Sequence, residues 1–427
     1  MRENVKRKMT TEPIDFKSDF KRPLPEGWRW VRLGEVCKIN PVRRSMLQRS
    51  DETTTTFVPM AAVDEIKGEI IRQETRPYVE VKKGYTYFEE KDVLFAKITP
   101  CMQNGKHAIA KGLIGGIGLG STEFHVIRPG NIIISEWIHS FIRQPWVLTS
   151  ATAHFTGAVG QQRVPEYFLY NLLLPLPPLP EQKRIAAILN EQMEAVEKAR
   201  KATQAQLEAA KTLSAAYLRQ VFPRLDEELP TGWRWVRLGE VCRVVGGSTP
   251  RTDNPSYWDG GIVWITPTDL GKLDGIHITT SIRKITRIGY ESCGTELLPT
   301  GSIVLSSRAP IGHLGIADVP LCTNQGCKSF IPGEKIESNF LFRVLKKFVK
   351  QLQALGSGAT FTEISKSNLQ SFLIPLPPLS EQKRIAAILN EQMEAVEKVR
   401  TALEVQLKTI NTLPASLLRR AFSGELQ

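Results

Sequence analysis

The most constraining feature of this sequence is a long segment that occurs twice with almost no change. The stretch PLPPLPEQKRIAAILNEQMEAVEKAR spans residues 175–200 and returns at residues 375–400. The two copies differ at only two places, Pro180/Ser380 and Ala199/Val399. A chain that carries the same segment twice is organised as a tandem, so its fold must contain two related units.

A shorter repeat lies upstream of each copy. Residues 24–37, LPEGWRWVRLGEVC, return at residues 229–242 with the single change of Glu26 to Thr231. Each unit therefore has a constant head, a variable middle and a constant tail. Identical surfaces presented twice suggest one type of partner that docks twice, and divergent middles suggest that two different things are recognised.

Length and charge fit a two-domain recognition protein. A chain of 427 residues is too long for one ordinary core, and 41% hydrophobic with 23% charged residues is typical of globular proteins. The formal charge of +12 and the pI near 9.4 favour a polyanionic partner, nucleic acid before an anionic membrane. On charge alone, a basic surface without such a partner remains the alternative.

The sequence contains no signal for export or membrane insertion. Residues 1–22 are charged throughout, and the apolar stretch at residues 167–179 is short and broken by prolines. Cys322 and Cys327 are separated by four residues with no second pair, which is poor spacing for zinc. We therefore expect a cytoplasmic protein with reduced thiols and no metal site.

Each tail predicts a long amphipathic helix after its proline-rich start. Apolar residues recur three or four positions apart from Ile185 to Val221 and from Ile385 to Leu417. Each run covers about 40 residues, or about 60 Å as a helix, and Pro414 is expected to bend the second one. Helices of this length cannot bury their apolar stripes alone, so we expect them to pair as a coiled coil. The domain between them can return the chain in either direction, and we prefer the antiparallel arrangement because it relates the two units by a pseudo-twofold. Two separate amphipathic core helices are the alternative.

The variable middles, residues 39–174 and 243–374, predict mixed α/β domains. Short β-rich runs such as residues 302–308 are bounded by glycine and proline turns. In each middle a glycine-rich turn, at residues 157–163 and 356–362, precedes a short helical pattern. Such a turn either presents backbone N–H groups to a phosphate or is a plain structural turn, and both interpretations stay open.

No catalytic constellation is found. Asn254-Pro-Ser-Tyr is similar to the motif with which amino-methyltransferases hold the target amine, but no Rossmann-like strand and glycine turn precede it. A surface turn is therefore the preferred interpretation. The glycines at residues 115–120 lack dinucleotide spacing, and there is no Walker A sequence. The six histidines show no pairing at ligand spacing. We expect a chain that is not an enzyme and binds neither a cofactor nor a metal.

These segments predict an α/β protein in which two mixed domains are joined by two long antiparallel helices, with a pseudo-twofold repeat. The predicted order is a charged extension at 1–20, a first recognition domain at 21–178, a first long helix at 179–222, a second recognition domain at 223–378 and a second long helix at 379–427.

The whole arrangement resembles the DNA-specificity subunit of Type I restriction-modification enzymes. The resemblance rests on the repeated WRWVRLGE heads and PLPPL-x-EQ-x-RI helix starts, and it covers nearly the whole chain. The two middles look like two sorts of target recognition domain in that family. The first carries FAKITPCMQNGK at residues 95–106 and GSTEFHV at 120–126; the second carries GGSTP at 246–250, YWDG at 257–260 and TNQG at 323–326.

The resemblance implies a non-catalytic subunit that reads an asymmetric bipartite DNA target with one recognition domain per half-site. It also implies that two methyltransferase subunits dock on the repeated helices, with two nuclease-translocase subunits as optional partners. S-adenosylmethionine is then expected on the partner methyltransferase and not on this chain. The rival interpretations are a coiled-coil adaptor without DNA binding and a self-sufficient methyltransferase.

Polar residues in loops are the candidates for DNA contact, because lysine and arginine hold phosphates while amide, hydroxyl and guanidinium groups read base edges. In the first domain these are Lys97, Gln103, Asn104, Lys106, Gln161, Gln162 and Arg163. In the second they are Thr249, Arg251, Arg308, Asn324, Gln325, Lys328, Thr360 and Thr362. The candidates for methyltransferase contact, from the repeated helix starts, are Gln182, Arg184, Ile188, Gln382, Arg384 and Ile388.

Overall fold

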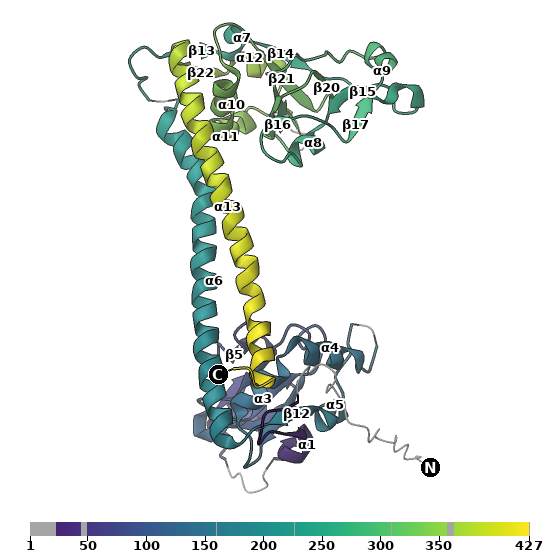
Figure 1. The fold of residues 1–427 in the computed structure, drawn as a ribbon, viewed down its shortest axis with the longest axis vertical. Coiled ribbons are helices and arrows are strands. Elements are labelled where there is room, and N and C mark those ends of the chain that lie inside the picture. The colour runs from purple at the N-terminus through teal and green to yellow at the C-terminus, as the bar shows by residue number, and fades with distance from the viewer. Residues whose placement is uncertain are drawn as a thin grey trace. The chain divides into compact units, whose positions relative to one another are not determined.

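The computed structural model describes residues 23–43, 49–158, 160–225, 227–308, 310–356 and 363–426. The chain forms two compact units (Figure 1). Unit 1 comprises Met1–Ala202 and Leu407–Gln427, and unit 2 comprises Thr203–Gln406. Each long helix therefore contributes one half to each unit.

In each unit the head repeat and the proline-rich start of the tail repeat form a two-stranded antiparallel sheet. In unit 1, β1 (Arg29–Arg32) pairs with β12 (Leu173–Leu176), and in unit 2, β13 (Arg234–Arg237) pairs with β22 (Leu373–Leu376). One-turn helices follow the head strands, α1 (Leu33–Val36) and α7 (Leu238–Val241). The proline-rich segments are extended because proline disfavours a helical residue before it. The two repeats of a unit thus build one joint.

The first recognition domain contains two four-stranded sheets. The first sheet is antiparallel throughout and has the order β2 (Cys37–Ile39), β11 (Phe124–Pro129), β8 (Val93–Ala96), β9 (His107–Ile109). The second has the order β6 (Glu74–Pro77), β3 (Thr54–Val58), β10 (Ile117–Gly120), β7 (Thr86–Glu89), with β3 and β10 parallel. A small hairpin joins β4 (Val63–Asp64) to β5 (Glu69–Ile70). The helical segments are η2 (Met60–Ala62), α2 (Tyr78–Val81), η3 (Ile114–Gly116), α3 (Ser135–Ile142), α4 (Pro145–Ala153) and α5 (Glu166–Asn171).

The second recognition domain repeats this plan with different residues. Its larger sheet has the order β14 (Cys242–Gly246), β21 (Cys327–Pro332), β18 (Ile303–Ser306), β19 (Leu314–Ala317), β16 (His277–Ile278). Its smaller sheet has the order β17 (Arg283–Ile285), β15 (Trp258–Ile265), β20 (Leu321–Thr323), with β15 and β20 parallel. The helical segments are η4 (Pro255–Tyr257), α8 (Pro267–Gly271), α9 (Arg287–Glu291), α10 (Ser338–Lys347), α11 (Val349–Ala354) and α12 (Lys366–Ser371).

The two domains share a topology that their sequences conceal. In each domain, one sheet contains four strands in the same antiparallel order, β2-β11-β8-β9 or β14-β21-β18-β19. The other sheet contains a parallel pair, β3 with β10 or β15 with β20, flanked by an antiparallel edge strand, β6 or β17. The prediction of mixed α/β domains is confirmed.

The tails form single long helices, α6 (Leu179–Val221, 43 residues) and α13 (Leu379–Phe422, 44 residues). The second helix continues through Pro414, so the proline does not end it. It ends at Phe422 rather than running to residue 427 as expected, and Gly424 just beyond adopts a positive φ of 74°, which suits glycine and terminates the helical path.

The two helices are antiparallel within each unit. In unit 1, Ile185 and Leu189 at the start of α6 share a core with Leu418 at the end of α13. In unit 2, Ile385 and Leu389 at the start of α13 share a core with Leu218 at the end of α6. The predicted antiparallel coiled coil is therefore confirmed.

Each helix end also docks on a recognition domain. The ring of Phe422 lies 4.3 Å from that of Trp137 in α3, and the ring of Phe222, which follows α6, lies 5.5 Å from that of Phe340 in α10. All four side chains are buried. In both units, the recognition domain at the start of one helix is thus closed by the end of the other.

Candidate nucleic-acid interface

In the first recognition domain, two loops that are far apart in sequence form one surface. The backbone N–H of Thr99 donates to the carbonyl oxygen of Gln162 at 3.0 Å, and that of Val164 donates to Lys97 at 2.8 Å. Ile98 and Arg163 form an isolated β-bridge. The loop after β8 and the segment before α5 are therefore joined, which brings together the candidates predicted from each.

Several of these candidates are already engaged inside the protein. The Lys106 ammonium donates to the carbonyl oxygen of Val63 at 2.9 Å, so it supports the loop. Arg163 makes two hydrogen bonds to the Glu123 carboxylate, both at 2.8 Å, and this lowers the pKa of that carboxyl. Gln103 accepts a hydrogen bond from the Thr99 hydroxyl at 2.6 Å. Lys106 and Arg163 are thus better described as loop supports than as DNA contacts.

Other candidates of this surface are available to a ligand. Among the described residues, no hydrogen bond or ion pair engages the side chains of Lys97, Asn104, Gln161 or Gln162. Asn104 and Gln161 are exposed. The surface therefore offers one cation and three amides.

The glycine-rich turn at residues 157–163 behaves as a structural turn. Gly157 and Gly160 adopt positive φ values of 108° and 85°. The bridging residue Arg163 separates the turn from α5, and Glu166 places an acidic group in the first turn of that helix. An acidic first turn disfavours an anion at a helix N-terminus.

In the second domain, three loops converge in the same manner. The Thr249 hydroxyl donates to the side-chain oxygen of Gln325, and the backbone N–H of Ser248 donates to Thr323 at 3.0 Å. The backbone N–H of Ser307 donates to Gly326 at 2.8 Å, which ties the loop after β18 to the loop after β20. The structure thus brings Thr249 and Gln325 into contact.

The absence of a side chain at Gly326 allows Arg308 and Asn324 to approach this turn closely. Its N–H donates to Asn324 Oδ1 at 2.9 Å. A β-carbon at this position would lie 3.2 Å from both Arg308 Nε and Asn324 Oδ1, so any larger residue would crowd them. Arg308 and Asn324 therefore lie against the same turn as Gln325.

The other candidates of the second domain fall outside this cluster. Lys328 forms an ion pair with Glu363 at 2.7 Å and is only 13% exposed, so it is structural. Arg251 pairs with Asp253 at 2.9 Å on the open surface. Thr360 and Thr362 lie outside the described residues, as does most of the turn at 356–362.

Two tryptophans position the Thr249 loop: Trp258, which belongs to the YWDG motif, and Trp264, which the sequence did not single out. The indole N–H of Trp264 donates to the carbonyl oxygen of Ser248 at 3.1 Å, and that of Trp258 donates to Arg251 at 3.2 Å. Their rings contact edge to face at 5.1 Å. The signal in the sequence was the WDGGIVW run that follows the loop, in which two tryptophans recur on one strand.

His107 and Cys37 of the first domain are buried core residues, and His139 is half-buried and hydrogen-bonded to the carbonyl oxygen of His107. His107 stacks on Phe95 with ring centroids 4.2 Å apart, and burial lowers its pKa well below the ordinary value. The pKa of His139 falls to about 3, chiefly through burial. Burial raises the pKa of the Cys37 thiol to about 12. Within the described residues, no three His, Cys, Asp or Glu side chains gather as a metal site would require.

Gln182 and Gln382 were predicted to contact a partner, and this prediction is wrong. Gln182 is fully buried and receives the Ile134 N–H at 3.0 Å. Its amide donates to the carbonyl oxygens of Ile132 and Pro177 at 2.9 and 2.8 Å. Every one of these groups belongs to its own recognition domain or joint. The side chain therefore clamps the start of α6 to that domain.

The second glutamine makes an equivalent clamp in unit 2. Gln382 receives the Glu337 N–H at 2.9 Å and donates to the carbonyl oxygens of Lys335 and Pro377 at 3.0 and 2.9 Å. Neither glutamine is available to another protein.

The remaining predicted partner residues are on accessible helix faces. Arg184 and Arg384 form ion pairs with Glu181 and Glu381, the residues three positions before them. Ile188 is half-buried against the core of unit 1, whereas the equivalent Ile388 is 38% exposed.

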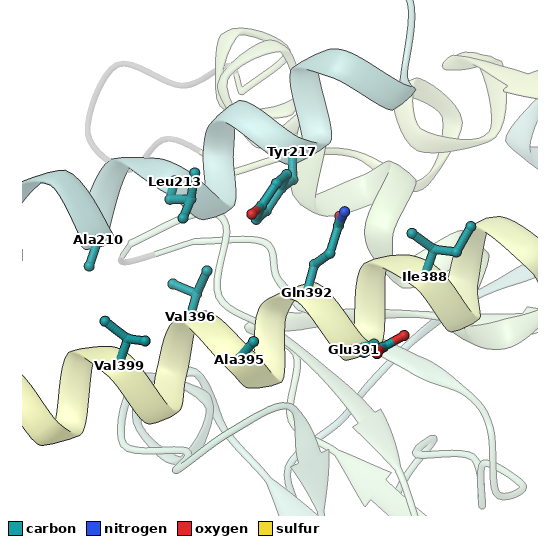
Figure 2. Close-up of a pocket in the computed structure, with 9 residues that line it drawn as sticks. All are labelled: Ala210, Leu213, Tyr217, Ile388, Glu391, Gln392, Ala395, Val396 and Val399. Carbon is teal, nitrogen blue, oxygen red and sulfur yellow. The ribbon is translucent and has the colours of Figure 1, made fainter.

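Within unit 2, Ile388 lines an apolar groove of about 480 Å³ between α6 and α13. Figure 2 shows Leu213 and Tyr217 on α6 and Val396 on α13 pointing into the space between the helices. The complete lining is Ala210, Leu213, Tyr217, Ile388, Glu391, Gln392, Ala395, Val396 and Val399.

Comparison with known protein families matches residues 25–209 and 230–408 to the Type I restriction modification DNA specificity domain. The two matched segments correspond to the two repeats. The chain belongs to the Type I restriction-modification specificity family. It is accordingly a specificity subunit of such a system and not one of the catalytic subunits.

Individual members of the specificity family match over almost the whole chain. The EcoEI specificity subunit of Escherichia coli is 37% identical over 510 residues, covering 93% of this chain and 83% of that protein. The EcoAI specificity subunit of Escherichia coli is 26% identical, covering 94% of this chain and 84% of that protein.

Solved structures of the specificity family show the same fold. The HsdS subunit from Thermoanaerobacter tengcongensis aligns with a TM-score of 0.69 and 29% identity, covering 96% of this chain and 100% of that chain. A chain from a type I R-M system, whose complex assembly and conformational transition were described, aligns with a TM-score of 0.75 and 30% identity, covering 95% and 100%.

Two further observations concern segments that were considered in the sequence. The Asn254 side chain accepts the N–H of Ser256 at 3.1 Å, so the sequence resembling an amino-methyltransferase motif caps a surface turn, η4. Among the described helices, none combines the length and apolar character that a membrane span requires.

Proposed function

We propose that this chain reads an asymmetric bipartite DNA target, one recognition domain per half-site, and holds two methyltransferase subunits. The observation that carries the proposal is the convergence of polar loops in both domains. In each domain, the loop after the corresponding strand, β8 or β18, is hydrogen-bonded to a second loop distant in sequence. Two domains that recognise different DNA sequences require loops at the same positions of the fold with different side chains.

The two surfaces differ in the hydrogen-bonding groups they offer. The first offers the amides of Asn104, Gln161 and Gln162, and glutamine and asparagine amides pair with two atoms of adenine in the major groove. The second offers the Arg308 guanidinium, whose preferred base partner is guanine, together with Asn324 and Gln325. Lys97 contributes positive charge for phosphates in the first domain. An asymmetric target follows from these unlike groups.

The methyltransferase subunits are proposed to dock on exposed apolar positions along the paired long helices. Leu213 and Leu413 occupy equivalent positions, one in each unit, and both are 39% exposed. In unit 2, Leu213 lines the apolar groove that also contains Ile388. Exposed leucines at equivalent positions in the two units are consistent with two equivalent binding sites. Each site would take an apolar helix of the same type of partner.

S-adenosylmethionine is assigned to the methyltransferase partner in this proposal, and this chain supplies only recognition and docking. Nuclease-translocase subunits would join the complex through the same assembly. The length of the paired helices would set the spacer between the half-sites, because both helices pass from one unit into the other.

Domain exchange tests the proposal directly. Replacing residues 39–174 with the equivalent segment of another family member, and mapping methylated bases in host DNA, should change one half of the recognised sequence and leave the other half intact. The matched exchange of residues 243–374 should change only the other half. A coiled-coil adaptor without DNA binding would leave the methylation pattern unchanged in both exchanges.

Assays of the purified chain test the remaining alternative, a self-sufficient methyltransferase. A self-sufficient methyltransferase would bind labelled S-adenosylmethionine and methylate DNA without partners, whereas the proposal expects neither. Activity of the isolated chain that is lost in an Asn254→Ala variant would overturn the assignment of catalysis to a partner.

A further inference from the structure

The second recognition domain holds an arginine that neither the repeats nor the loop motifs point to. Arg283 begins β17 and is exposed, and its guanidinium carbon lies 3.5 Å from the ring centroid of Trp258. Trp258 itself is only 6% exposed, so the ring is a fixed part of the core. In the part of the chain that the structure describes, no ion pair or side-chain hydrogen bond joins Arg283 to another residue.

The backbone that carries Arg283 is held on both sides. Its carbonyl oxygen accepts the Ser281 hydroxyl at 2.6 Å, and the same hydroxyl oxygen accepts the backbone N–H of Trp264 at 3.1 Å. The N–H of Ile282 donates to Asp269 Oδ1 at 2.8 Å. The Asp269 carboxylate is therefore occupied by neutral donors and does not neutralise the arginine.

The Trp258 ring connects Arg283 to the predicted reading surface. The indole N–H of Trp258 holds the carbonyl oxygen of Arg251, at the end of the loop that carries Thr249. Thr249 in turn contacts Gln325. Trp258 therefore contacts both groups: its ring lies under the Arg283 guanidinium, and its indole N–H binds the loop that carries Thr249.

The first domain has a similar stack with a different charge balance. Arg76, on the equivalent edge strand β6, lies 3.9 Å from the ring centroid of Phe57 on β3. Arg76 also pairs with Glu74 at 2.7 Å, so its charge is compensated within the protein. The stack is shared by the two domains, but only in the second does it present a cation without a carboxylate.

We propose that Arg283 is a phosphate contact for the second half-site, which rests on the proposed DNA-binding function and extends it to a residue outside the loops. The Arg283 guanidinium stands over the Trp258 ring and, within the described residues, donates to no other side chain, so its N–H donors are available to match two phosphate oxygens. Because Arg283 lies on strand β17, outside the loops that carry the candidate base readers, we assign it to the DNA backbone rather than to a base edge. The stack also pre-orders the side chain, which reduces the entropy lost on binding.

The test measures binding of the full chain, co-purified with its methyltransferase, to two fluorescent duplexes, one containing the mapped target and one lacking it. Arg283→Ala should weaken both complexes by the same factor, about fivefold near 0.15 M salt, and reduce the slope of log affinity against log salt by about one. Arg283→Lys, which keeps the charge, should retain the slope. Arg287→Ala is the matched control, because Arg287 is an exposed arginine of the same region that is already paired with Glu291.

The outcomes are distinct. Equal weakening on both duplexes with a reduced salt slope, and no more than about a twofold change for Arg287→Ala, supports the phosphate contact. Weakening confined to the target duplex would make Arg283 a base reader and overturn the inference, as would an unchanged slope. If the unaltered complex binds neither duplex, the proposed function itself fails.

Discussion

The joints between recognition domain and long helix are the same in both units, although the domains that they join have diverged. Gln182 and Gln382 each receive one backbone N–H and donate to two backbone carbonyl oxygens. The residues that supply the N–H groups, Ile134 and Glu337, have nothing in common as side chains. Because every contact is made to the backbone, one side chain can clamp two unrelated sequences, provided that their backbones follow the same path.

The recognition surfaces show the opposite behaviour. Side-chain ion pairs accompany these surfaces, Arg163 with Glu123 at the first surface and Lys328 with Glu363 on β21 of the second domain, outside the Thr249 cluster. These contacts join side chains, so both partners must change together when the surface changes. A residue whose backbone makes the contact can therefore change independently. Where two side chains make the contact, a change in one residue requires a change in its partner.

The largest effect is expected from breaking the clamp. Gln182→Leu leaves the Ile134 N–H and two carbonyl oxygens without their partner in a buried position, and should destabilise unit 1 by about 3 kcal/mol. Gln382→Leu should destabilise unit 2 by a similar amount, because it removes the same set of contacts. Amide hydrogen exchange of peptides from each domain measures the two effects separately.

The control for the clamp is Gln206→Ala on the exposed face of α6, which should leave exchange in both domains unchanged. A large difference between the two glutamine variants would show that the joints are not energetically equivalent despite their shared geometry.

A somewhat smaller effect is expected for methyltransferase docking, and here the two units should differ. Ile388→Asp places a charge in the exposed groove of unit 2 and should weaken binding of one partner subunit by about 2–3 kcal/mol with little effect on folding. Ile188→Asp should also destabilise unit 1, since Ile188 is packed against its core.

Native mass spectrometry with a thermal-unfolding measurement checks the docking prediction. The expected result is a fall from two bound methyltransferases to one for Ile388→Asp, with an unchanged melting temperature. Lys383→Ala, a change at an exposed position five residues earlier in the same helix, serves as the control. A complex with one partner as its fullest stoichiometry in the unaltered chain would contradict the two-seat proposal.

Acid should destabilise the first recognition domain before the second. Burial lowers the pKa values of His107 and His139 below the ordinary value of 6.5, and for His139 to about 3. Below about pH 6.5 the folded domain binds fewer protons than the unfolded chain, so the stability present above that pH is lost as the pH falls. Each histidine should cost about 1.4 kcal/mol per pH unit in this window.

Hydrogen exchange at neutral and mildly acidic pH, corrected for intrinsic rates, checks the acid prediction. His277→Asn is the control, because His277 is an exposed residue of the second domain, and this change should leave the acid profile of the first domain unaltered. Equal acid sensitivity of the two domains would contradict a cause in the buried histidines.

The smallest expected change concerns the spacer between the half-sites. Inserting about four residues, one helical turn of about 6 Å, after both Arg200 and Arg400 preserves the pairing of the two helices while lengthening them. Since DNA rises about 3.4 Å per base pair, the tolerated spacer should grow by about one or two base pairs. Methylation mapping with the original spacer retained would show that the helices do not set the distance.

Local sequence determined much of this protein. The helical period from Ile185 onward predicted α6 and α13, because apolar residues spaced three or four apart form one face of a helix whatever lies around them. The prolines at residues 175 and 375 predicted extended segments, since proline restricts its own backbone and that of its neighbour. The near-identical repeats predicted two related units, and the family resemblance followed from the same residues.

The tertiary structure alone decided which polar residues are available. Gln182 belongs to the polar pattern at the start of a helix and looks like a surface residue, yet it is buried because three backbone groups of the recognition domain converge on it. Lys106 and Arg163 look like DNA contacts in the sequence, but partners distant along the chain engage them. Arg283 and Trp258 meet only because β17 pairs with β15. Hydrogen bonds, ion pairs and ring contacts of this kind depend on strand pairing and long-range packing, which no local pattern of residue types specifies.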